Sequence, residues 1–232
     1  HTRLSVVSWA RRCVKETAYN VQADNSVIGK LNAQQFVEVE LVAGKLALKY
    51  NTISQGTFSR VTIVAEGNGT LAIKSKAPSV RERKYQDHIE ISVVKGRMTI
   101  VNKVSMENYL CGVIESEGGG GRDPEYYKVQ AVMSRTYALK NKSRHRKEGF
   151  GLCDGVHCQA YHNMLKYTPE IRTAVRETHD DVLVDEKNRL VTTYFSANCG
   201  GEVCDASHVW NNSVDHCLLY TSPSPRDDRY SR

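Results

Sequence analysis

The feature that most constrains this chain is a change in the spacing of its apolar residues near Ser105. Before this point they alternate with polar residues, as in FVEVELV (36–42) and KLALKY (45–50), which is typical of strands that bury one face. After it they recur at the spacing of an amphipathic helix, at Met106, Tyr109, Leu110, Val113 and Ile114. The change predicts an α+β chain, with a β-rich N-terminal half followed by a core of mixed helices and strands.

Two further pairs of alternating runs predict β-hairpins in the first half. RVTIVAEGNGTLAIKSK (60–76) has two arms around Gly67-Asn68-Gly69, and HIEISVVKGRMTIVNK (88–103) has two arms around Lys95-Gly96. Glycine and asparagine accept the positive φ angles that tight hairpin turns require. No residue in this half has a pattern that indicates catalysis.

The second half contains signals for three helices. Ser105 is a predicted N-cap for a helix that ends at Gly118, and Asp123-Pro124 predicts the cap and first residue of a second helix. A third helix is expected to begin at 168–170, where the sequence is Thr-Pro-Glu. Residues 181–198 then predict two strands joined around 186–188.

The two ends of the chain carry their own expectations. The chain begins at His1 rather than at methionine, so we expect a fragment, with any membrane anchor outside it. Residues 217–227, CLLYTSPSPRD, look like the translation of a sequencing-library adapter. We therefore expect a β-rich region over 1–103, a truncated core over 104–216, and a non-native tail over 217–232.

Charge gives only a weak indication of the partner. The formal net charge is +6, and the lysines and arginines are scattered except for the run KNKSRHRK (140–147). Such a run suits nucleic acid or an anionic polymer of the cell envelope. No apolar stretch approaches the ~20 residues of a membrane span.

Two glutamates stand at the end of the first predicted helix, in GVIESEGGGG (112–121). They are two residues apart, so at ~100° per residue Glu115 and Glu117 point to different faces and form no local acid/base pair. Glu117 follows Val113 by four residues and therefore extends the apolar stripe. There we expect it to be desolvated, which raises the pKa of a carboxyl, as a general acid requires. The alternative is that Glu117 simply marks the helix end.

The strongest metal-binding pattern is a set of two histidines and two cysteines, His145, Cys153, His157 and Cys158. Two imidazoles and two thiolates suffice for a closed tetrahedral zinc site. Alternatively, His145 belongs to the basic loop and one of the cysteines is a small buried apolar residue. His162 and the pair Cys199 and Cys204 are alternative ligands, and this pair is also suited to a local disulfide.

Five sequence blocks together resemble the SpoIID/LytB family of sporulation and cell-wall proteins. They are SMENYLCGVIESE, KVQAVMSRTYAL, GLCDGVHCQAY, TTYFSANCGG and VW. Their order and spacing match the family from about Val104 to Trp210, whereas the β-rich half is only loosely similar. The family often has Met-Pro after its acid, where this chain has Gly118-Gly119, which predicts a looser loop.

The resemblance implies a peptidoglycan lytic transglycosylase that cuts glycan strands, preferably stripped of peptides, and leaves 1,6-anhydro ends. It implies that Glu117 is the single acid/base. It also implies a structural Zn²⁺ held by Cys153, His157 and Cys158, with His145 as the fourth ligand. The expected location is the cell envelope, either periplasmic or otherwise extracytoplasmic.

Four further residues are candidates for lining the glycan groove, namely Arg135, Gln159, Tyr161 and Ser196. Arg135 is equally well interpreted as a cation on a helix surface. A rival function is a non-catalytic glycan-binding module that enhances a cell-wall amidase. A zinc-dependent nucleic-acid binder is a third reading, but neither a set of stacking aromatic residues nor a basic stripe is evident, so nucleic acid is not an expected partner.

Overall fold

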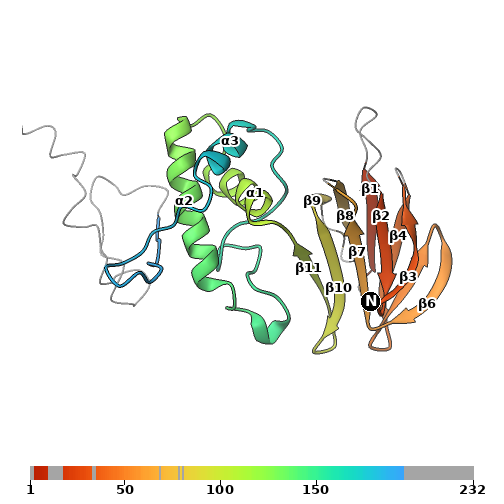
Figure 1. Cartoon of the computed structure of the whole chain (residues 1–232). Coiled ribbons are helices and arrows are strands. Elements are labelled where there is room, and N and C mark those ends of the chain that lie inside the picture. The colour runs from red at the N-terminus through yellow and green to blue at the C-terminus, as the bar shows by residue number, and fades with distance from the viewer. Residues whose placement is uncertain are drawn as a thin grey trace, which may run out of the picture.

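The computed structural model describes residues 3–9, 18–32, 35–67, 69–77, 79 and 81–195. Its strands are β1 (Arg3–Trp9), β2 (Tyr19–Ala23), β3 (Ser26–Leu31), β4 (Phe36–Val42), β5 (Lys45–Tyr50), β6 (Ile53–Phe58), β7 (Arg60–Ala65), β8 (Thr70–Ala77), β9 (Arg83–Gln86), β10 (His88–Val94) and β11 (Arg97–Lys103). Its helices are α1 (Met106–Gly118), α2 (Pro124–Asn141), a short 3-10 helix η1 (Arg146–Glu148) and α3 (Glu170–Glu177). The strands and helices occupy separate parts of the molecule, which confirms the α+β prediction (Figure 1).

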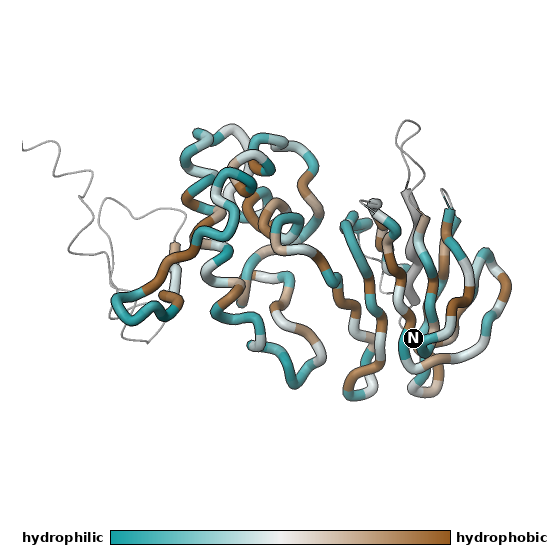
Figure 2. The backbone as a smooth tube through the Cα atoms, in the orientation of Figure 1, coloured by the Kyte–Doolittle hydropathy of each residue, from teal (hydrophilic) through white to brown (hydrophobic). Residues whose placement is uncertain are grey.

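The strands form two antiparallel sheets that enclose one hydrophobic core. The strand orders are β6-β5-β4-β1-β8-β9 and β11-β10-β7-β2-β3. Both sheets contribute fully buried side chains to this core, including Val37, Val39, Leu46, Leu48 and Leu71 from the first and Val21, Val61, Ile63, Ile89 and Ile91 from the second. Hydrophobic and hydrophilic residues alternate along these strands, so each sheet buries one face (Figure 2).

The prediction of a hairpin over 60–76 is wrong. Its two arms form strands, β7 and β8, but β7 pairs with β2 and β10 whereas β8 pairs with β1 and β9. The segment between the arms therefore carries the chain from one sheet to the other. Gly67, with φ of 108°, supplies the unusual backbone angle for this crossing. Alternation alone does not tell whether neighbouring strands pair with each other or cross the core.

The hairpin predicted over 88–103 is confirmed. β10 and β11 pair in register up to Val94 and Arg97, which leaves Lys95 and Gly96 as a two-residue turn. Both turn residues have positive φ, 49° and 74°, as the right-handed strand twist favours. β11 then leads through residues 104–105 directly into α1, so this hairpin joins the sandwich to the helices (Figure 1).

The three predicted helices are present and form a second core. Ser105 Oγ accepts the Asn108 N–H at 3.3 Å, and Asp123 Oδ1 accepts the Glu125 N–H at 2.8 Å, so both predicted N-caps are confirmed. The core side chains are Leu110 and Ile114 from α1, Tyr127 and Ala131 from α2, and Ile171, Ala174 and Val175 from α3. In the part of the chain that is described, no helix is both long and apolar enough to cross a membrane.

The two strands predicted over 181–198 are not formed in the described part of that segment. A single bridge joins Val184 to Leu190, and residues 191–195 have no strand structure. The segment instead follows α2, where the Thr193 hydroxyl donates to the Met133 carbonyl at 2.8 Å. A lone two-stranded hairpin is marginally stable in water, so packing on a neighbouring helix decides the conformation.

Candidate functional site

The C-terminal end of α1 is fixed to the loop that leads into α3. The Glu115 carboxylate accepts the backbone N–H groups of Lys166, Tyr167 and Thr168, each at 2.8 Å. An ionised carboxylate has about four acceptor positions, so three of them are used here. Glu115 is therefore an anchor for the loop, and its oxygens are largely occupied.

Glu117 has a different environment from the one that the apolar stripe predicts. The residue is exposed, so the predicted desolvation is wrong. α1 ends at Gly118, one residue later, and no further helical turn covers the stripe. Glu117 Oε1 accepts the Ala160 N–H at 2.6 Å, and its Oε2 accepts no hydrogen bond from the described residues. One oxygen is thus fixed and the other remains available.

Two of the glycines after Glu117 leave the backbone uncovered, whereas Gly118 lies against the Tyr126 side chain and Gly120 against the Thr168 hydroxyl. Gly119 and Gly121 have φ of 65° and 73°, a conformation that side chains with a Cβ rarely adopt. At both positions, no described atom lies within 4 Å of where a Cβ would stand. A polymer can approach this backbone closely on the side of Glu117.

A close contact between α1 and the loop before α3 was not predicted. A Cβ on Gly112 would lie 2.4 Å from the Asn163 carbonyl oxygen and 2.5 Å from Tyr161 Cε2, so only glycine fits. The same loop binds the edge of the sandwich, since the Asn163 Oδ1 accepts the Lys84 N–H and the Met164 N–H donates to the Lys84 carbonyl, both at 2.7 Å. The loop thus joins α1 to β9. The only sequence signal was the glycine at position 112 inside an apolar helix.

The four residues of the predicted metal site lie together. One ligand atom from each of His145, Cys153, His157 and Cys158 lies within 4.8 Å of the others. Cys158 Sγ is 3.4 Å from His145 Nε2 and 3.7 Å from His157 Nδ1, and Cys153 Sγ is 3.7 Å from His157 Nδ1. None of the described cysteines, Cys153, Cys158 and Cys111, forms a disulfide.

These distances fit a tetrahedral zinc ion. With Zn–S of about 2.3 Å and Zn–N of about 2.0–2.1 Å, sulfur and nitrogen ligands stand roughly 3.6 Å apart. His145 also has a second contact, because its Nδ1 lies 2.8 Å from Glu148 Oε2. A carboxylate on the other ring nitrogen is the usual way of orienting a metal-binding histidine. His145 therefore has the orientation of a ligand, whereas His162, an alternative, is outside this cluster.

Two of the predicted groove residues point into the protein. Arg135 is 3% exposed, and its guanidinium donates to the backbone carbonyls of Val175 and Asp181 at 3.2 and 3.1 Å. Gln159 is also 3% exposed, accepts the Tyr109 hydroxyl at 3.1 Å and donates to the Ser134 carbonyl. The structure thus places the Arg135 and Gln159 side chains in buried contacts between segments of the helical half. Neither presents its polar group to solvent.

Tyr161 lies in the wall of a cavity of about 520 Å³ between β8, β10, β11 and residues 150–154. Its ring packs against Tyr109 and Tyr85, with centroids 5.0 and 5.7 Å apart, and its hydroxyl donates to Asn102 Oδ1 at 2.8 Å. Burial raises the pKa of this hydroxyl far above its ordinary value. The fourth predicted groove residue, Ser196, lies outside the described residues, as do Cys199 and Cys204.

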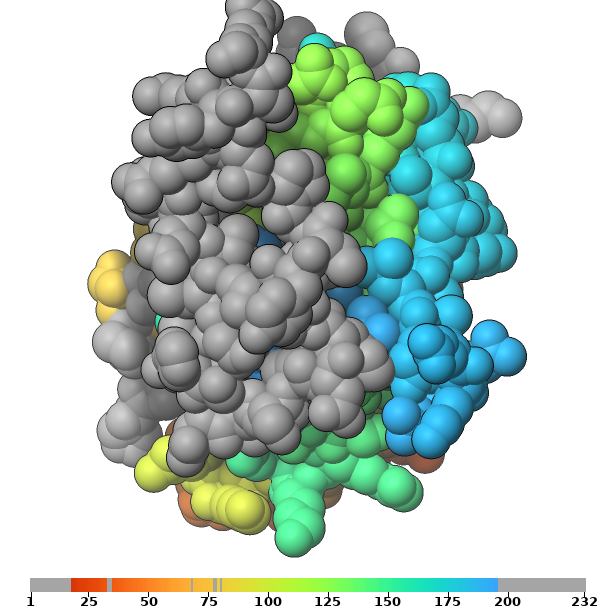
Figure 3. Space-filling view, turned by 90° about the vertical axis from the view of Figure 1, so that its left-hand side faces the viewer, coloured from red at the N-terminus to blue at the C-terminus, as the bar shows by residue number. Residues whose placement is uncertain are grey.

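The loop that carries His145 also contacts the sandwich. Figure 3 shows residues 140–150 (green) beside the β10–β11 turn (yellow) at the lower edge of the molecule, and the Gly149 Cβ position is 3.3 Å from Val94 Cγ2. Farther along, Arg83 and Asp154 form an ion pair at 2.6 Å. The cysteine and histidine cluster therefore lies where the two halves of the molecule meet.

Comparison with known proteins gives one family match and two relatives. Residues 94–184 match the family model of SpoIID, described as Stage II sporulation protein. The chain is 27% identical over 203 residues to an uncharacterised protein of Brachyspira hyodysenteriae, covering 86% of this chain and 50% of that protein. It is 22% identical over 165 residues to Stage II sporulation protein D of Bacillus amyloliquefaciens, covering 65% of this chain and 46% of that protein.

These relatives are longer than the chain, which spans about half the length of each. No solved structure gives a significant match. The family match covers β11, α1, α2, α3 and the cluster of His145, Cys153, His157 and Cys158.

Proposed function

Because residues 94–184 match the family model of SpoIID, we propose that the chain is a peptidoglycan lytic transglycosylase with Glu117 as its acid and base. This match supports a cell-wall-related role. The observation that carries the finer proposal is the setting of Glu117. The residue is exposed, one carboxylate oxygen is held by the Ala160 N–H, and Gly119 and Gly121 leave room for a polymer.

One carboxyl group suffices for this reaction. Neutral Glu117 protonates the glycosidic oxygen as the C1–O bond of N-acetylmuramic acid breaks. The C6 hydroxyl of the same sugar attacks C1, and the Glu117 carboxylate takes the proton from that hydroxyl as the 1,6-anhydro ring closes. A hydrolase needs a second carboxylate to handle a water molecule, whereas here the nucleophile belongs to the substrate.

The exposure of Glu117 is compatible with this role when a glycan is bound. A strand lying over residues 118–121 would displace water from around the carboxyl, and removing water favours the neutral form of an acid. The Ala160 N–H fixes Oε1, so Oε2 is the oxygen that would donate the proton. Glu115 and Gly112 act indirectly, because they hold the loop that contains Ala160.

We further propose that His145, Cys153, His157 and Cys158 hold a structural zinc ion. Four protein ligands leave no open position for substrate, so a bound zinc would supply rigidity to residues 145–158 and no chemistry. Ala160 follows this segment by two residues. The proposed location is the cell envelope, and the proposed partner is the glycan strand of peptidoglycan.

The test uses the chain and two variants. Glu117→Gln removes the acid but keeps an oxygen that can accept the Ala160 N–H, and Glu186→Gln makes the same change at an exposed residue remote from α1. Each protein is incubated with glycan strands, both intact and stripped of peptides, and 1,6-anhydro ends are measured by mass spectrometry. We expect Glu117→Gln to lower product formation by about 10²–10⁴-fold, and Glu186→Gln to leave it unchanged.

The exposure of Glu117 also favours a second candidate, a non-catalytic module that binds glycan and enhances a cell-wall amidase. This candidate predicts no anhydro product from the parent chain. It also predicts that Glu117→Gln retains glycan binding and the stimulation of a purified amidase. If the parent chain and Glu117→Gln formed equal amounts of anhydro product, the catalytic acid would be a residue other than Glu117.

A further inference from the structure

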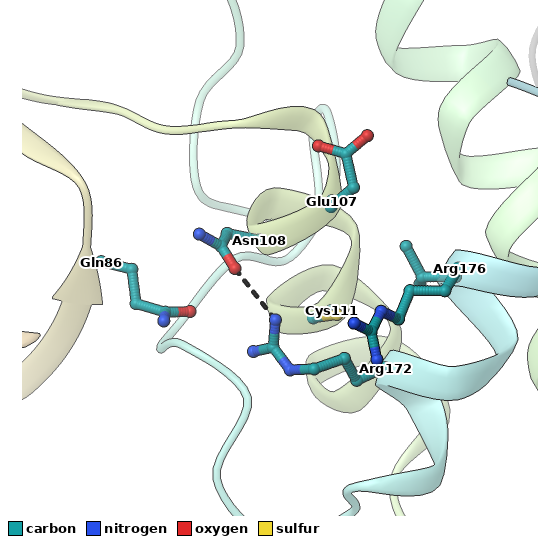
Figure 4. Close-up of a pocket in the computed structure, with 7 residues that line it drawn as sticks. Gln86, Glu107, Asn108, Cys111, Arg172 and Arg176 are labelled. Carbon is teal, nitrogen blue, oxygen red and sulfur yellow. Dashed lines mark hydrogen bonds between the residues drawn. The ribbon is translucent and has the colours of Figure 1, made fainter. Parts of the chain in front are cut away.

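A second cavity lies between the end of β9, α1 and α3. Its volume is about 350 Å³, and it is lined by Gln86, Glu107, Asn108, Cys111, Arg172, Val175 and Arg176. Gln86 approaches it from the end of β9, and the two arginines approach from α3 (Figure 4). None of these residues has a part in the function proposed above. The cavity is large enough for a small organic molecule.

Gln86 has an unsatisfied hydrogen-bonding atom at this cavity. The residue is 8% exposed, and its Oε1 is buried without a hydrogen-bond partner among the described residues. Its side chain extends toward Asn108 and Arg172 (Figure 4). A buried carbonyl oxygen that makes no hydrogen bond costs about 1–3 kcal/mol, so such atoms are rare and indicate a missing partner. The missing partner must be a donor.

The opposite side of the cavity carries positive charge. Arg172 Nη1 donates to Asn108 Oδ1 at 3.1 Å, and the Asn108 Nδ2 in turn donates to the Asp87 carboxylate. These contacts orient the Arg172 guanidinium and leave its other N–H groups open. Neither Arg172 nor Arg176 forms a salt bridge with a described residue. A planar guanidinium that is held in place is well suited to a carboxylate.

The remaining wall cancels only part of this charge, because it contributes one carboxylate, that of Glu107, against the two guanidinium groups. Glu107 is 3.3 Å from His179 and forms an ion pair with it when the imidazole is protonated. Burial raises the pKa of the Cys111 thiol to about 11, so Cys111 is neutral near pH 7 and contributes an uncharged surface. Val175 adds an apolar contact. The cavity therefore offers two cations, one carboxylate and one hydrogen-bond acceptor, next to the uncharged thiol of Cys111.

We propose that this cavity binds a small molecule that carries a carboxylate and, a few bonds away, an N–H donor, as in an N-acylated amino acid or the end of a short peptide. The carboxylate would bind Arg172 and Arg176, and the N–H would donate to Gln86 Oε1. The cavity is separate from the Glu117 site, since Glu117 is six residues beyond Cys111, about 9 Å along the helix axis. The inference does not depend on the function proposed for Glu117.

Four probes separate the two halves of this recognition. N-acetylglycine carries both the carboxylate and the N–H, its methyl ester lacks the charge, and N-acetylsarcosine lacks the N–H. Inorganic phosphate tests whether any anion suffices. Binding is followed by NMR titration of the labelled full chain, with attention to the signals of Gln86 and Asn108. We expect saturable shifts with N-acetylglycine, and at least tenfold weaker binding of the other three probes.

Two variants assign the binding to this cavity. Gln86→Met keeps the side-chain volume but removes the acceptor, and it should weaken the binding of N-acetylglycine at least tenfold. The same variant should leave the melting temperature unchanged or higher, because an unsatisfied buried oxygen has been removed. Arg172→Met should abolish binding, and Lys187→Met, at an exposed residue in a distant loop, should leave it unaltered.

Each alternative outcome contradicts the proposal. Equal binding of phosphate, ester and N-acetylglycine would show a nonspecific anion site. No saturable binding of any probe would show that the cavity does not recognise this class of ligand. Unchanged affinity in Gln86→Met would mean that its oxygen takes no part. These readouts need no glycan cleavage, so they remain informative if the parent chain and Glu117→Gln both prove inactive.

Discussion

Two glutamates only two residues apart have separate roles. Glu115 accepts three backbone N–H groups and is partly buried, whereas Glu117 accepts one and is exposed. Glu115→Gln replaces one acceptor oxygen by an NH₂ group that faces the Lys166 N–H, which leaves a donor unsatisfied. We expect a loss of about 1–3 kcal/mol of unfolding free energy, seen as a fall of roughly 2–12 °C in Tm by calorimetry.

The matched control is Glu117→Gln, since the same change there keeps an acceptor for its single N–H. Its Tm should stay within about 1 °C of the parent value, while its activity is lost. If Glu115→Gln were fully stable but inactive, the roles assigned to the two acids would have to be exchanged. Sequence reasoning placed these residues on different helix faces. It had no means of finding their partners, which lie over forty residues later in the chain.

The element that most depends on a single residue is the loop between residues 160 and 168. Gly112→Ala would place a methyl group 2.4 Å from the Asn163 carbonyl oxygen and 2.5 Å from the Tyr161 ring. Alanine favours the helix by about 1 kcal/mol, but displacing a packed backbone costs more, typically 1–3 kcal/mol or above. We therefore expect a net loss of stability in thermal or urea unfolding, with weakened glycan cleavage.

Gly155→Ala is the control for this prediction, because no described atom lies within 4 Å of its Cβ position and its φ is not positive. It should unfold as the parent does. A Gly112→Ala variant at least as stable as the parent would show that the loop moves away from α1 at little cost, and the account of Ala160 as a fixed donor would fail with it.

Elements with a clear apolar pattern were predictable, including the edge strand β11, whereas three other edge strands were not. The helices follow from capping residues and apolar spacing, and β4, β5, β10 and β11 follow from alternation. The strands β3, β6 and β9, which no sequence pattern indicated, each lie at an edge of a sheet. An edge strand such as β6, ISQGTF, is mostly exposed or partly buried and needs few apolar residues. Its conformation is set by its neighbour.

The same reasoning explains which parts of the site were found. The four histidine and cysteine residues fall within fourteen positions, so sequence spacing sufficed to group them. Arg135 and Gln159 were interpreted as groove residues, yet both make buried contacts with backbone carbonyls of distant segments. Gln86 was not singled out at all. Its significance depends on α1 and α3 closing around it, which only the tertiary structure reveals.

At the scale of the whole molecule, the cluster of His145, Cys153, His157 and Cys158 lies between the core of the sandwich and the core of the helices. The segment that contains it binds the sandwich through Arg83–Asp154 and through Gly149 against Val94. If zinc holds this segment, its removal should loosen the junction before either core. We expect one zinc per chain by elemental analysis. Chelation should increase hydrogen exchange in residues 142–160 and in the β10–β11 turn, while β4 and β5 stay protected.

The same chelation should lower the stability of the full chain. A ligand present at a thousand times its Kd contributes about 4 kcal/mol, which corresponds to about 8–16 °C in Tm for a chain of this size. Cys158→Ala should lose both the zinc and this increment, because it removes a ligand. Cys111→Ala removes a thiol that lies outside the cluster and should keep the zinc. Two results would contradict this prediction: retention of one zinc per chain by Cys158→Ala, or an unaltered Tm after chelation. The cluster would then be a packing arrangement of two thiols and two imidazoles. The junction of this segment with the sandwich would depend on contacts such as the Arg83–Asp154 ion pair and that of Gly149 with Val94.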